Sequence, residues 1–119
     1  MKEFMLFVRT EGDHMLSLSP AEQQDHVQKI GKYIGDLIEK GKLKSAQPLD
    51  MDGLIISGKK NAFKDGPFNE TKEVIAGYFH IVAKDIDEAT EIAKANPIFE
   101  LEEDYSIEMR PIKTVEGIN

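Results

Sequence analysis

The sequence predicts an α+β domain, a ferredoxin-like antiparallel sheet with two helices on one face. Strand-like and helix-like segments follow one another in the order β-α-β-β-β-α-β, and two amphipathic helices can cover only one face of a single antiparallel sheet. Two of the strand-like segments are nevertheless apolar on both faces. A second copy of the chain is the simplest cover for the remaining face, so the same pattern predicts a face-to-face homodimer.

The two strands that are apolar on both faces are the first and the longest. Phe4–Val8 reads "FMLFV", an unbroken apolar run typical of a strand that is buried on both sides. Residues 75–84, "IAGYFHIVAK", are rich in β-branched and aromatic side chains, and only the phenol of Tyr78 and the imidazole of His80 interrupt the apolar faces. Shorter strands are expected at "LKSAQPL" (43–49), "GLIISGK" (53–59) and "YSIEMRPI" (105–112).

Both helices carry start and stop signals. Ser19 is a good N-cap, Glu22 completes a capping box three residues later, and Gly41 supplies a stop. The second helix is expected to follow its N-cap Asp85 and to end at Asn96-Pro97. The apolar stripe of the first helix recurs at helical spacing and consists of Val27, Ile30, Ile34, Leu37 and Ile38.

Two glycines, Gly31 and Gly35, lie inside the first helix. Each costs about 1 kcal/mol of helix stability relative to alanine. A close approach of the helix to the sheet would compensate for this cost, so we expect both glycines to face the sheet.

The composition excludes several classes of protein. A chain of 119 residues is expected to form one domain, residues 1–119. Because there is no cysteine, a disulfide framework and a cysteine-based zinc site or nucleophile are excluded. The net charge of -7 disfavours binding to nucleic acid or to an anionic membrane. No run approaches the ~20 apolar residues of a membrane span, so the chain is expected to be cytoplasmic.

No cofactor or metal is predicted. The sequence contains no glycine-rich phosphate-binding or dinucleotide-binding fingerprint and no serine-hydrolase elbow. It also lacks the paired histidine spacings of a metal site.

Three side chains are candidates for catalysis. His80 lies mid-strand on the same face as Tyr78, where it would act as an acid or base in a cavity between the sheet and its partner, or be a buried neutral histidine held by hydrogen bonds. His26 shares the edge of the first helix's apolar stripe with Tyr33. It would point into a cleft with Tyr33 or occupy a half-exposed boundary position.

The stretch "KDGPFNETKE" contains the second group of candidates. Asp65-Gly66-Pro67 predicts a tight turn that delivers the large apolar side chain of Phe68. One interpretation is a loop in which Phe68 plugs the end of the sheet. The other is the rim of a pocket, with backbone N–H groups and carboxylates at its mouth. The ligand-binding residues of this second interpretation are Asp65, Gly66, Pro67, Phe68 and Glu73.

At this motif the sequence resembles the YCII-related family, specifically its DGPF branch. The shared phrase is "DGPFNETKEVIAGYFHI", where the family reads D-G-P-F-x-E-T-K-E followed by a strand with a glycine and an aromatic residue. The resemblance continues through "FMLFV", "LSPAEQ", "EKGKLKSAQPL", "DIDEATEIAKANP" and "IEMRPI", and so covers about residues 3 to 112. It implies a dimeric α+β barrel of ferredoxin-like subunits, and the family has no settled activity.

The resemblance also implies a departure from the family. YCII-type members look as if they carry a proposed catalytic pair, a histidine on the first helix and an aspartate before a proline after the second helix. Here the dipeptide reads Asn96-Pro97, and the histidine position falls near Ile30, with His26 one turn earlier. The pair is therefore expected to be absent, and any chemistry would depend on His80, Tyr78, His26 or the motif carboxylates.

Three functions follow from these observations. The first is a homodimeric small-molecule-binding or regulatory module with a cleft between the sheet and its partner. The second is a small enzyme that uses His80 as a general acid or base on a metabolite in that cleft. The third is an interaction domain, because DGPF relatives can occur beside sigma-factor-type regulators.

Overall fold

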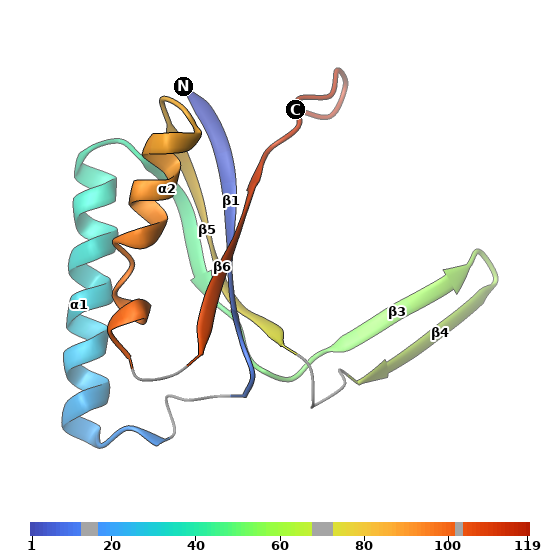
Figure 1. Cartoon of the computed structure of the whole chain (residues 1–119). Helices are drawn as coiled ribbons and strands as arrows, with labels where there is room; N and C mark the ends of the chain where they lie inside the picture. The colour runs from blue at the N-terminus through green and yellow to red at the C-terminus, as the bar shows by residue number, and fades with distance from the viewer. Residues whose placement is uncertain (13–16, 68–72, 102–103) are drawn as a thin grey trace.

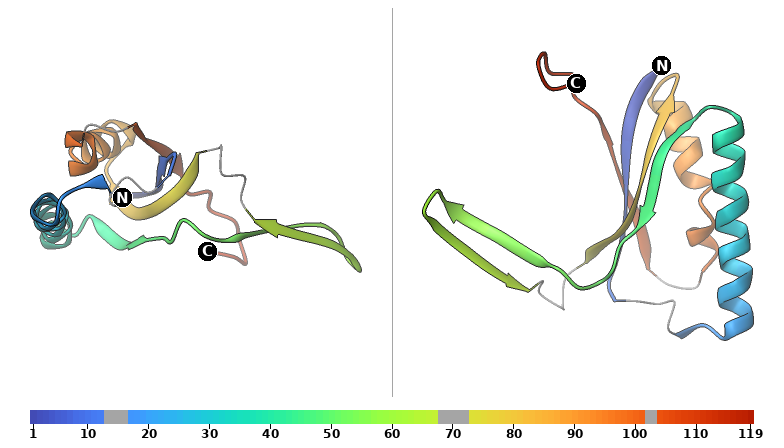
Figure 2. Two further views of the ribbon diagram at one scale, coloured as in Figure 1. Left: turned by 90° about the horizontal axis from the view of Figure 1, so that it is seen from below. Right: turned by 180° about the vertical axis from the view of Figure 1, so that it is seen from behind.

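The computed structural model describes residues 1–12, 17–67, 73–101 and 104–119. Its main sheet is antiparallel, with four strands in the order β2-β5-β1-β6, and both helices lie on one face (Figures 1 and 2). The α+β, ferredoxin-like class predicted from the sequence is confirmed. The elements are β1 (Lys2–Thr10), α1 (Pro20–Glu39), β2 (Leu43–Pro48), β3 (Leu54–Lys59), β4 (Ala62–Pro67), β5 (Val74–Ala83), α2 (Ile86–Lys94), the 3-10 helix η2 (Pro97–Glu100) and β6 (Tyr105–Pro111).

The core lies between the sheet and the helices. Alternate residues of β1 point into it, beginning with Phe4 and Leu6, which pair with Ile81 and Phe79 of β5. On the helical side Ala89 of α2 is fully buried, because a small side chain lets that helix approach the sheet closely. Each large apolar side chain buried here contributes about 1.5–3 kcal/mol. None of the helices in the described ranges is both long and apolar enough to cross a membrane.

Helix α1 begins as its capping signals predict. The hydroxyl of Ser19 accepts a hydrogen bond from the backbone N–H of Glu22 at 3.2 Å, and the carboxylate of Glu22 accepts one from the N–H of Ser19 at 3.0 Å. The helix ends at its C-cap Lys40, and the following Gly41 takes a positive φ of 69°. Glycine adopts this conformation without the steric cost of a side chain.

The buried face of α1 is rotated relative to the predicted stripe. His26 and Leu37 are buried, and Tyr33 packs against the core between them. Val27 and Ile38 were expected in the stripe, but their side chains are 62% and 60% exposed. The other three residues of the stripe face the core as predicted, since Leu37 is buried and Ile30 and Ile34 pack against the core.

Tyr33 connects helix α1 to helix α2 and to the sheet. Its hydroxyl donates a 2.6 Å hydrogen bond to the backbone carbonyl of Ile92 in α2, and its ring meets Phe79 edge-on at a centroid distance of 5.7 Å. Burial raises the pKa of the phenol to about 12, so the hydroxyl stays protonated and remains a donor. Tyr33 is thus engaged as a structural contact between the helices.

Strands β3 and β4 form a separate two-stranded sheet that projects from the body of the molecule (Figures 1 and 2). The tight turn predicted at Asp65-Gly66-Pro67 is wrong, because these residues lie on β4. The actual turn is at Lys60-Asn61, where Asn61 has a φ of 68°.

Gly58 explains why the turn forms there. It has a φ of 118°, and a Cβ at this position would clash with the backbone carbonyl oxygen of Ala62. A glycine on β3 and an asparagine in the left-handed region together give the chain its reversal, so the Asp-Gly signal further on is not needed for it. Pro67 is tolerated at the end of β4 because an edge strand needs no further N–H donor.

The expectation that Gly31 and Gly35 face the sheet is also wrong. Both are exposed, and a Cβ built on either would meet no atom within 4 Å. Glycine loses more conformational entropy on folding than other residues. In the described part of the chain, no close contact of Gly31 or Gly35 offsets this loss.

We therefore expect Gly31→Ala and Gly35→Ala each to raise the free energy of unfolding by about 0.5–1 kcal/mol. Urea denaturation of the single variants and the double variant measures this. Gly77→Ala is the contrasting control, since a Cβ there would lie 3.0 Å from the backbone carbonyl oxygen of Gln47. A loss of stability on Gly31→Ala would contradict the assignment of an open surface.

Candidate functional site

A cavity of about 460 Å³ lies between α1 and the end of the sheet where β1 and β2 finish. We call it the helix–sheet pocket. Its volume falls within the range of small-molecule sites, roughly 300–1,000 Å³. Its walls are mainly apolar and include Val8, Ile30, Ile34, Phe79 and Ile98, while the polar side chains include Thr10, His26, Gln47 and Asp50.

Small residues on β5 make room for this pocket. The pairing of β1 with β5 is interrupted by a bulge, so that Val8 pairs with Gly77 but the next residue, Arg9, pairs with Ile75. The skipped residue, Ala76, and Gly77 both line the pocket. A bulge bends its strand locally, and the small side chain of Ala76 leaves space beside it, whereas the missing side chain of Gly77 lets the backbone of Gln47 approach.

His26 enters the pocket from α1 and is only 9% exposed. Burial is the main cause that lowers the pKa of its imidazole, and the charge of Lys29 lowers it further, while Glu100 and Asp25 act in the opposite direction. The ring is therefore neutral at neutral pH. A neutral imidazole has one donor and one acceptor nitrogen, so it can bind a ligand or accept a proton from it.

Thr10 faces the same pocket from the end of β1 and is 1% exposed. Its hydroxyl has no hydrogen-bond partner among the described residues. Leaving such a group unsatisfied costs about 1–3 kcal/mol, which a hydrogen bond from a ligand would recover. Sequence reasoning missed Thr10, although it has the same parity along β1 as the buried Phe4, Leu6 and Val8. The signal in the sequence that could have identified Thr10 was a polar residue at a core-facing position of a strand.

The resemblance assigns the family's proposed catalytic pair to the positions of Ile30 and Asn96. Ile30 lines the pocket one turn after His26. Asn96 is 2% exposed, and its side-chain oxygen accepts a 3.0 Å hydrogen bond from the N–H of Ile98. Its side-chain nitrogen has no partner within the described ranges. Asn96 thus begins η2 as a cap and supplies no carboxylate.

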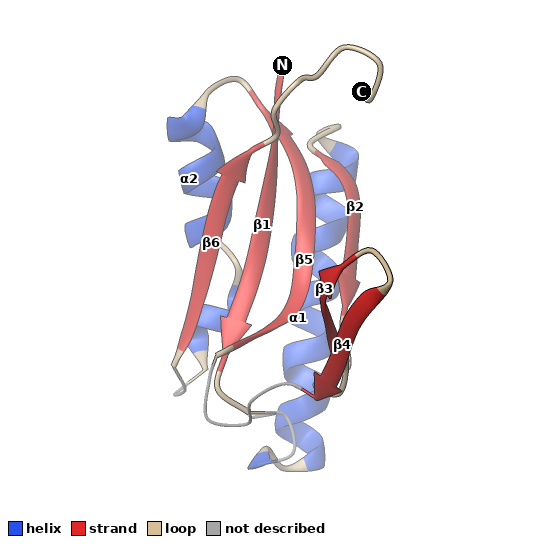
Figure 3. Cartoon of the chain, turned by 90° about the vertical axis from the view of Figure 1, so that its right-hand side faces the viewer, coloured by secondary structure: helices blue, strands red, loops and turns tan. Residues whose placement is uncertain are grey.

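His80 lies on the other face of the sheet, because it alternates along β5 with the buried Phe79 and Ile81. We call this the open face, because neither helix covers it (Figure 3). Its Nε2 is 2.8 Å from Oε1 of Glu3, and Nζ of Lys44 is 3.4 Å from the same oxygen. The hydrogen bond with His80 is the largest cause that lowers the pKa of Glu3. Glu3, the partner that orients this imidazole, lies 77 residues away in sequence and was not predicted.

A second cavity, of about 590 Å³, lies on the open face where the β3–β4 hairpin leaves the body. We call it the corner pocket, and Tyr78, Phe7 and Ile55 line it together with Arg9 and Glu73. Nε of Arg9 is 3.6 Å from Oε2 of Glu73, and its Nη1 donates a 2.7 Å hydrogen bond to Glu108. Glu73 is therefore the partner of a cation at this pocket.

The predicted site residues are thus divided between separate regions. His26 belongs to the helix–sheet pocket, whereas Tyr78 and Glu73 belong to the corner pocket. His80 shares the open face with Tyr78, two residues away on β5. Asp65, Gly66 and Pro67 lie on β4, and Phe68 lies outside the described residues.

The YCII-related domain model matches residues 3–115, nearly the whole chain. The chain belongs to the YCII-related family. A search of the curated proteins found no match. Membership of the YCII-related family agrees with the resemblance in the sequence and with the ferredoxin-like fold. It assigns no reaction to the helix–sheet pocket.

The pKa of His26 predicts how stability depends on pH. Because the folded pKa lies below the ordinary value of 6.5, the unfolded chain binds more protons between the two values. The free energy of unfolding should therefore decrease as the pH falls through about 6.5, by at most about 1.4 kcal/mol per pH unit.

Urea denaturation between pH 7.5 and pH 5.5 measures this dependence. This window avoids the carboxylates Glu3 and Glu88, whose lowered pKa values matter only below about 4.5. His26→Phe should show a shallower dependence than the wild type. Equal slopes in the two proteins would contradict a buried neutral imidazole.

Proposed function

We propose that this YCII-related protein, as a member of the DGPF branch, is a cytoplasmic homodimer that binds a small molecule in the helix–sheet pocket. The observation that supports it best is the meeting of His26 and Thr10 in an apolar cavity of ligand size. Both side chains are nearly buried, and the threonine hydroxyl lacks a partner within the described part of the chain. Apolar walls with a few converging polar groups are typical of a ligand site.

The lining indicates the kind of ligand. Asp50 is the only charged side chain among the described residues that line the pocket. An anionic ligand would therefore find no cation there and one carboxylate. A neutral or weakly basic molecule fits better, with an apolar ring or chain against Phe79 and Ile34 and a hydrogen-bonding group near His26 and Thr10.

The homodimer is supported by the open face of the sheet. Met5 and Phe7 of β1 and Tyr78 and Val82 of β5 are only partly buried there. Apolar side chains on an unpartnered face favour a second copy as its cover. Such a dimer would enclose a cleft at the corner pocket, which the carboxylate of Glu73 lines, and the motif residues Asp65, Gly66 and Pro67 on β4 are further proposed ligand contacts.

A second candidate function is supported by the pair of His80 and Glu3. A carboxylate 2.8 Å from Nε2 orients an imidazole, and this arrangement suits a general acid or base. Under this proposal the enclosed cleft holds a metabolite, with Tyr78 on the same face as a further hydrogen-bonding group. The two candidates differ in which histidine the ligand needs.

Thr10→Val tests the first candidate without changing the shape of the pocket. If the hydroxyl has no hydrogen-bond partner in the unliganded protein, valine should raise the free energy of unfolding of that protein by about 1 kcal/mol, because an unsatisfied buried polar group is removed. The same variant should weaken ligand binding. A hydroxyl with a structural partner would instead make Thr10→Val destabilising, and that result would contradict the proposal.

A thermal-shift screen can identify the ligand and the histidine on which its binding depends. Neutral aromatic and alicyclic metabolites, simple amines and matched carboxylates would be tested against the wild type, His26→Phe and His80→Phe. A ligand present at about 100 times its dissociation constant adds about 2.7 kcal/mol of stability. We expect hits among neutral or basic compounds that are lost in His26→Phe and kept in His80→Phe. The reverse pattern would favour the enzyme with His80, and hits confined to carboxylates would contradict the assigned ligand class.

A further inference from the structure

The segment between β2 and β3, residues 49–53, borders both the helix–sheet pocket and the corner pocket. We call it the linker. Leu49 and Asp50 line both cavities. The backbone N–H of Leu49 donates a 2.9 Å hydrogen bond to the carbonyl oxygen of Ala76, which fixes the start of the linker beside β5. Asp50, the next residue, is therefore held at the boundary of the helix–sheet pocket.

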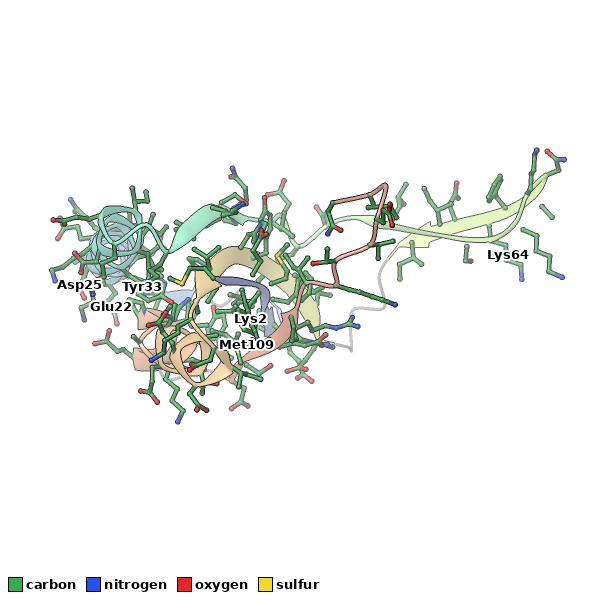
Figure 4. All side chains as sticks on the ribbon, turned by 90° about the horizontal axis from the view of Figure 1, so that it is seen from above. Lys2, Glu22, Asp25, Tyr33, Lys64 and Met109 are labelled. Atoms are coloured by element: carbon green, nitrogen blue, oxygen red, sulfur yellow. The ribbon has the colours of Figure 1, made fainter. Side chains whose placement is uncertain are left out.

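The linker places two carboxylates at this boundary. Asp50 is exposed and is the only charged residue that lines the helix–sheet pocket within the described ranges. Asp52 lines the corner pocket. None of the ion pairs among the described residues includes Asp50 or Asp52, and Lys64 of the following hairpin lies far out on the projecting strands (Figure 4). The boundary thus has negative charge without a partner in the described part of the chain.

The one arginine nearby is already engaged. Arg9 is the only lysine or arginine among the described residues that line either pocket. Its Nη1 donates a 2.7 Å hydrogen bond to Glu108, and its Nε is 3.6 Å from Oε2 of Glu73. The whole chain carries a net charge of -7. Both the local and the overall charge therefore attract a cation and repel an anion.

The buried wall of the helix–sheet pocket accepts a cation as well. The hydroxyl of Thr10 is buried and has no partner among the described residues, so it can both donate to and accept from a ligand. Burial is the largest cause that lowers the pKa of His26. The neutral ring does not repel a positive charge in the same cavity, and it too can hydrogen-bond a hydroxyl of the ligand.

The fold sets the separation between these two polar regions. Val8 of β1 and Pro48 of β2 both pair with Gly77 of β5. Thr10 and Asp50 each lie two residues beyond these neighbours of one glycine, on opposite sides of β5. Strands β1 and β2 are two strand spacings apart, about 10 Å. A ligand that contacts both side chains is therefore elongated, with a polar group at each end and an apolar middle.

We propose that the ligand of the helix–sheet pocket is a protonated aralkyl amine whose ammonium binds Asp50. Its ring packs against the apolar walls, such as Phe79 and Ile34, and a hydroxyl at its far end meets Thr10 and His26. An ammonium and a carboxylate form a charge-assisted hydrogen bond, which is stronger than a neutral one. The inference rests on the proposed function, and it names the ligand class and the specificity-determining residue of that site.

Three phenols of matched shape test the charge of the ligand. At neutral pH tyramine is a cation, para-ethylphenol is neutral and para-hydroxyphenylpropionate is an anion, while all three present the same ring and hydroxyl. Isothermal titration calorimetry should show tyramine binding at least about five-fold more tightly than para-ethylphenol and the anion more weakly than either. Raising the salt from about 50 mM to about 500 mM should weaken the binding of tyramine and not of para-ethylphenol.

Asp50→Asn tests the residue, because it removes the charge and keeps the shape of the side chain. It should reduce the affinity for tyramine to that for para-ethylphenol and leave the affinity for para-ethylphenol unchanged. Asp52→Asn is the matched control, since it makes the same change of net charge two residues away, outside the lining of the helix–sheet pocket. We expect it to change the affinity for tyramine by at most about two-fold.

The outcomes distinguish this inference from the proposed function. Equal binding of tyramine and para-ethylphenol, or an equal loss of both in Asp50→Asn, overturns the ligand class alone. Binding of both that persists in His26→Phe and Thr10→Val overturns the proposed pocket as well. If tyramine does not bind at millimolar concentration, the ligand class is wrong, and the wider thermal-shift screen against His26→Phe decides the proposed function by itself. Circular dichroism checks that each variant is folded.

Discussion

The antiparallel pairing of β1 with β5 is the interaction on which the rest of the structure depends. Its register, with Phe4 opposite Ile81 and Leu6 opposite Phe79, assigns one set of alternate side chains to the helices and the other to the open face. A slip of one residue would exchange these sets and would bring His80 into the apolar layer. The core, both pockets and the pair of His80 with Glu3 all follow from this register.

The helix–sheet pocket arises where the pattern of the core is broken. Thr10 occupies a core-facing position on β1, and His26 occupies one on α1, although neither is apolar. A hydroxyl and an imidazole in these positions reduce stability unless they are satisfied. Positions at which a chain departs from its own pattern are those where function is expected, and here two departures from different elements line one cavity.

The two faces of the sheet differ in how closely their side chains pack and in the charged groups that they carry. On the helical face the side chains are closely packed, apart from the helix–sheet pocket. On the open face partly exposed apolar residues lie beside charged groups such as Glu3 and Arg9. The hairpin projects from this second face (Figure 1), and its positive charge contrasts with the negative charge of the remaining chain. The helix–sheet pocket and the uncovered open face therefore lie on opposite sides of one sheet.

Local signals determined much of this protein from the sequence alone. The capping box of Ser19 and Glu22, the stop at Gly41 and the apolar runs along β1 and β5 predicted the helices, the strands and the two-faced sheet, because each signal acts within a few residues. The family followed from the same sequence.

Only the tertiary structure decided the rest. The outward position of Gly31, the contact of His80 with Glu3 and the shared pocket of His26 and Thr10 depend on how distant segments are placed against each other. The 77 residues between Glu3 and His80 carry no local signal of their contact. It exists because the sheet's register brings the two side chains to the same face.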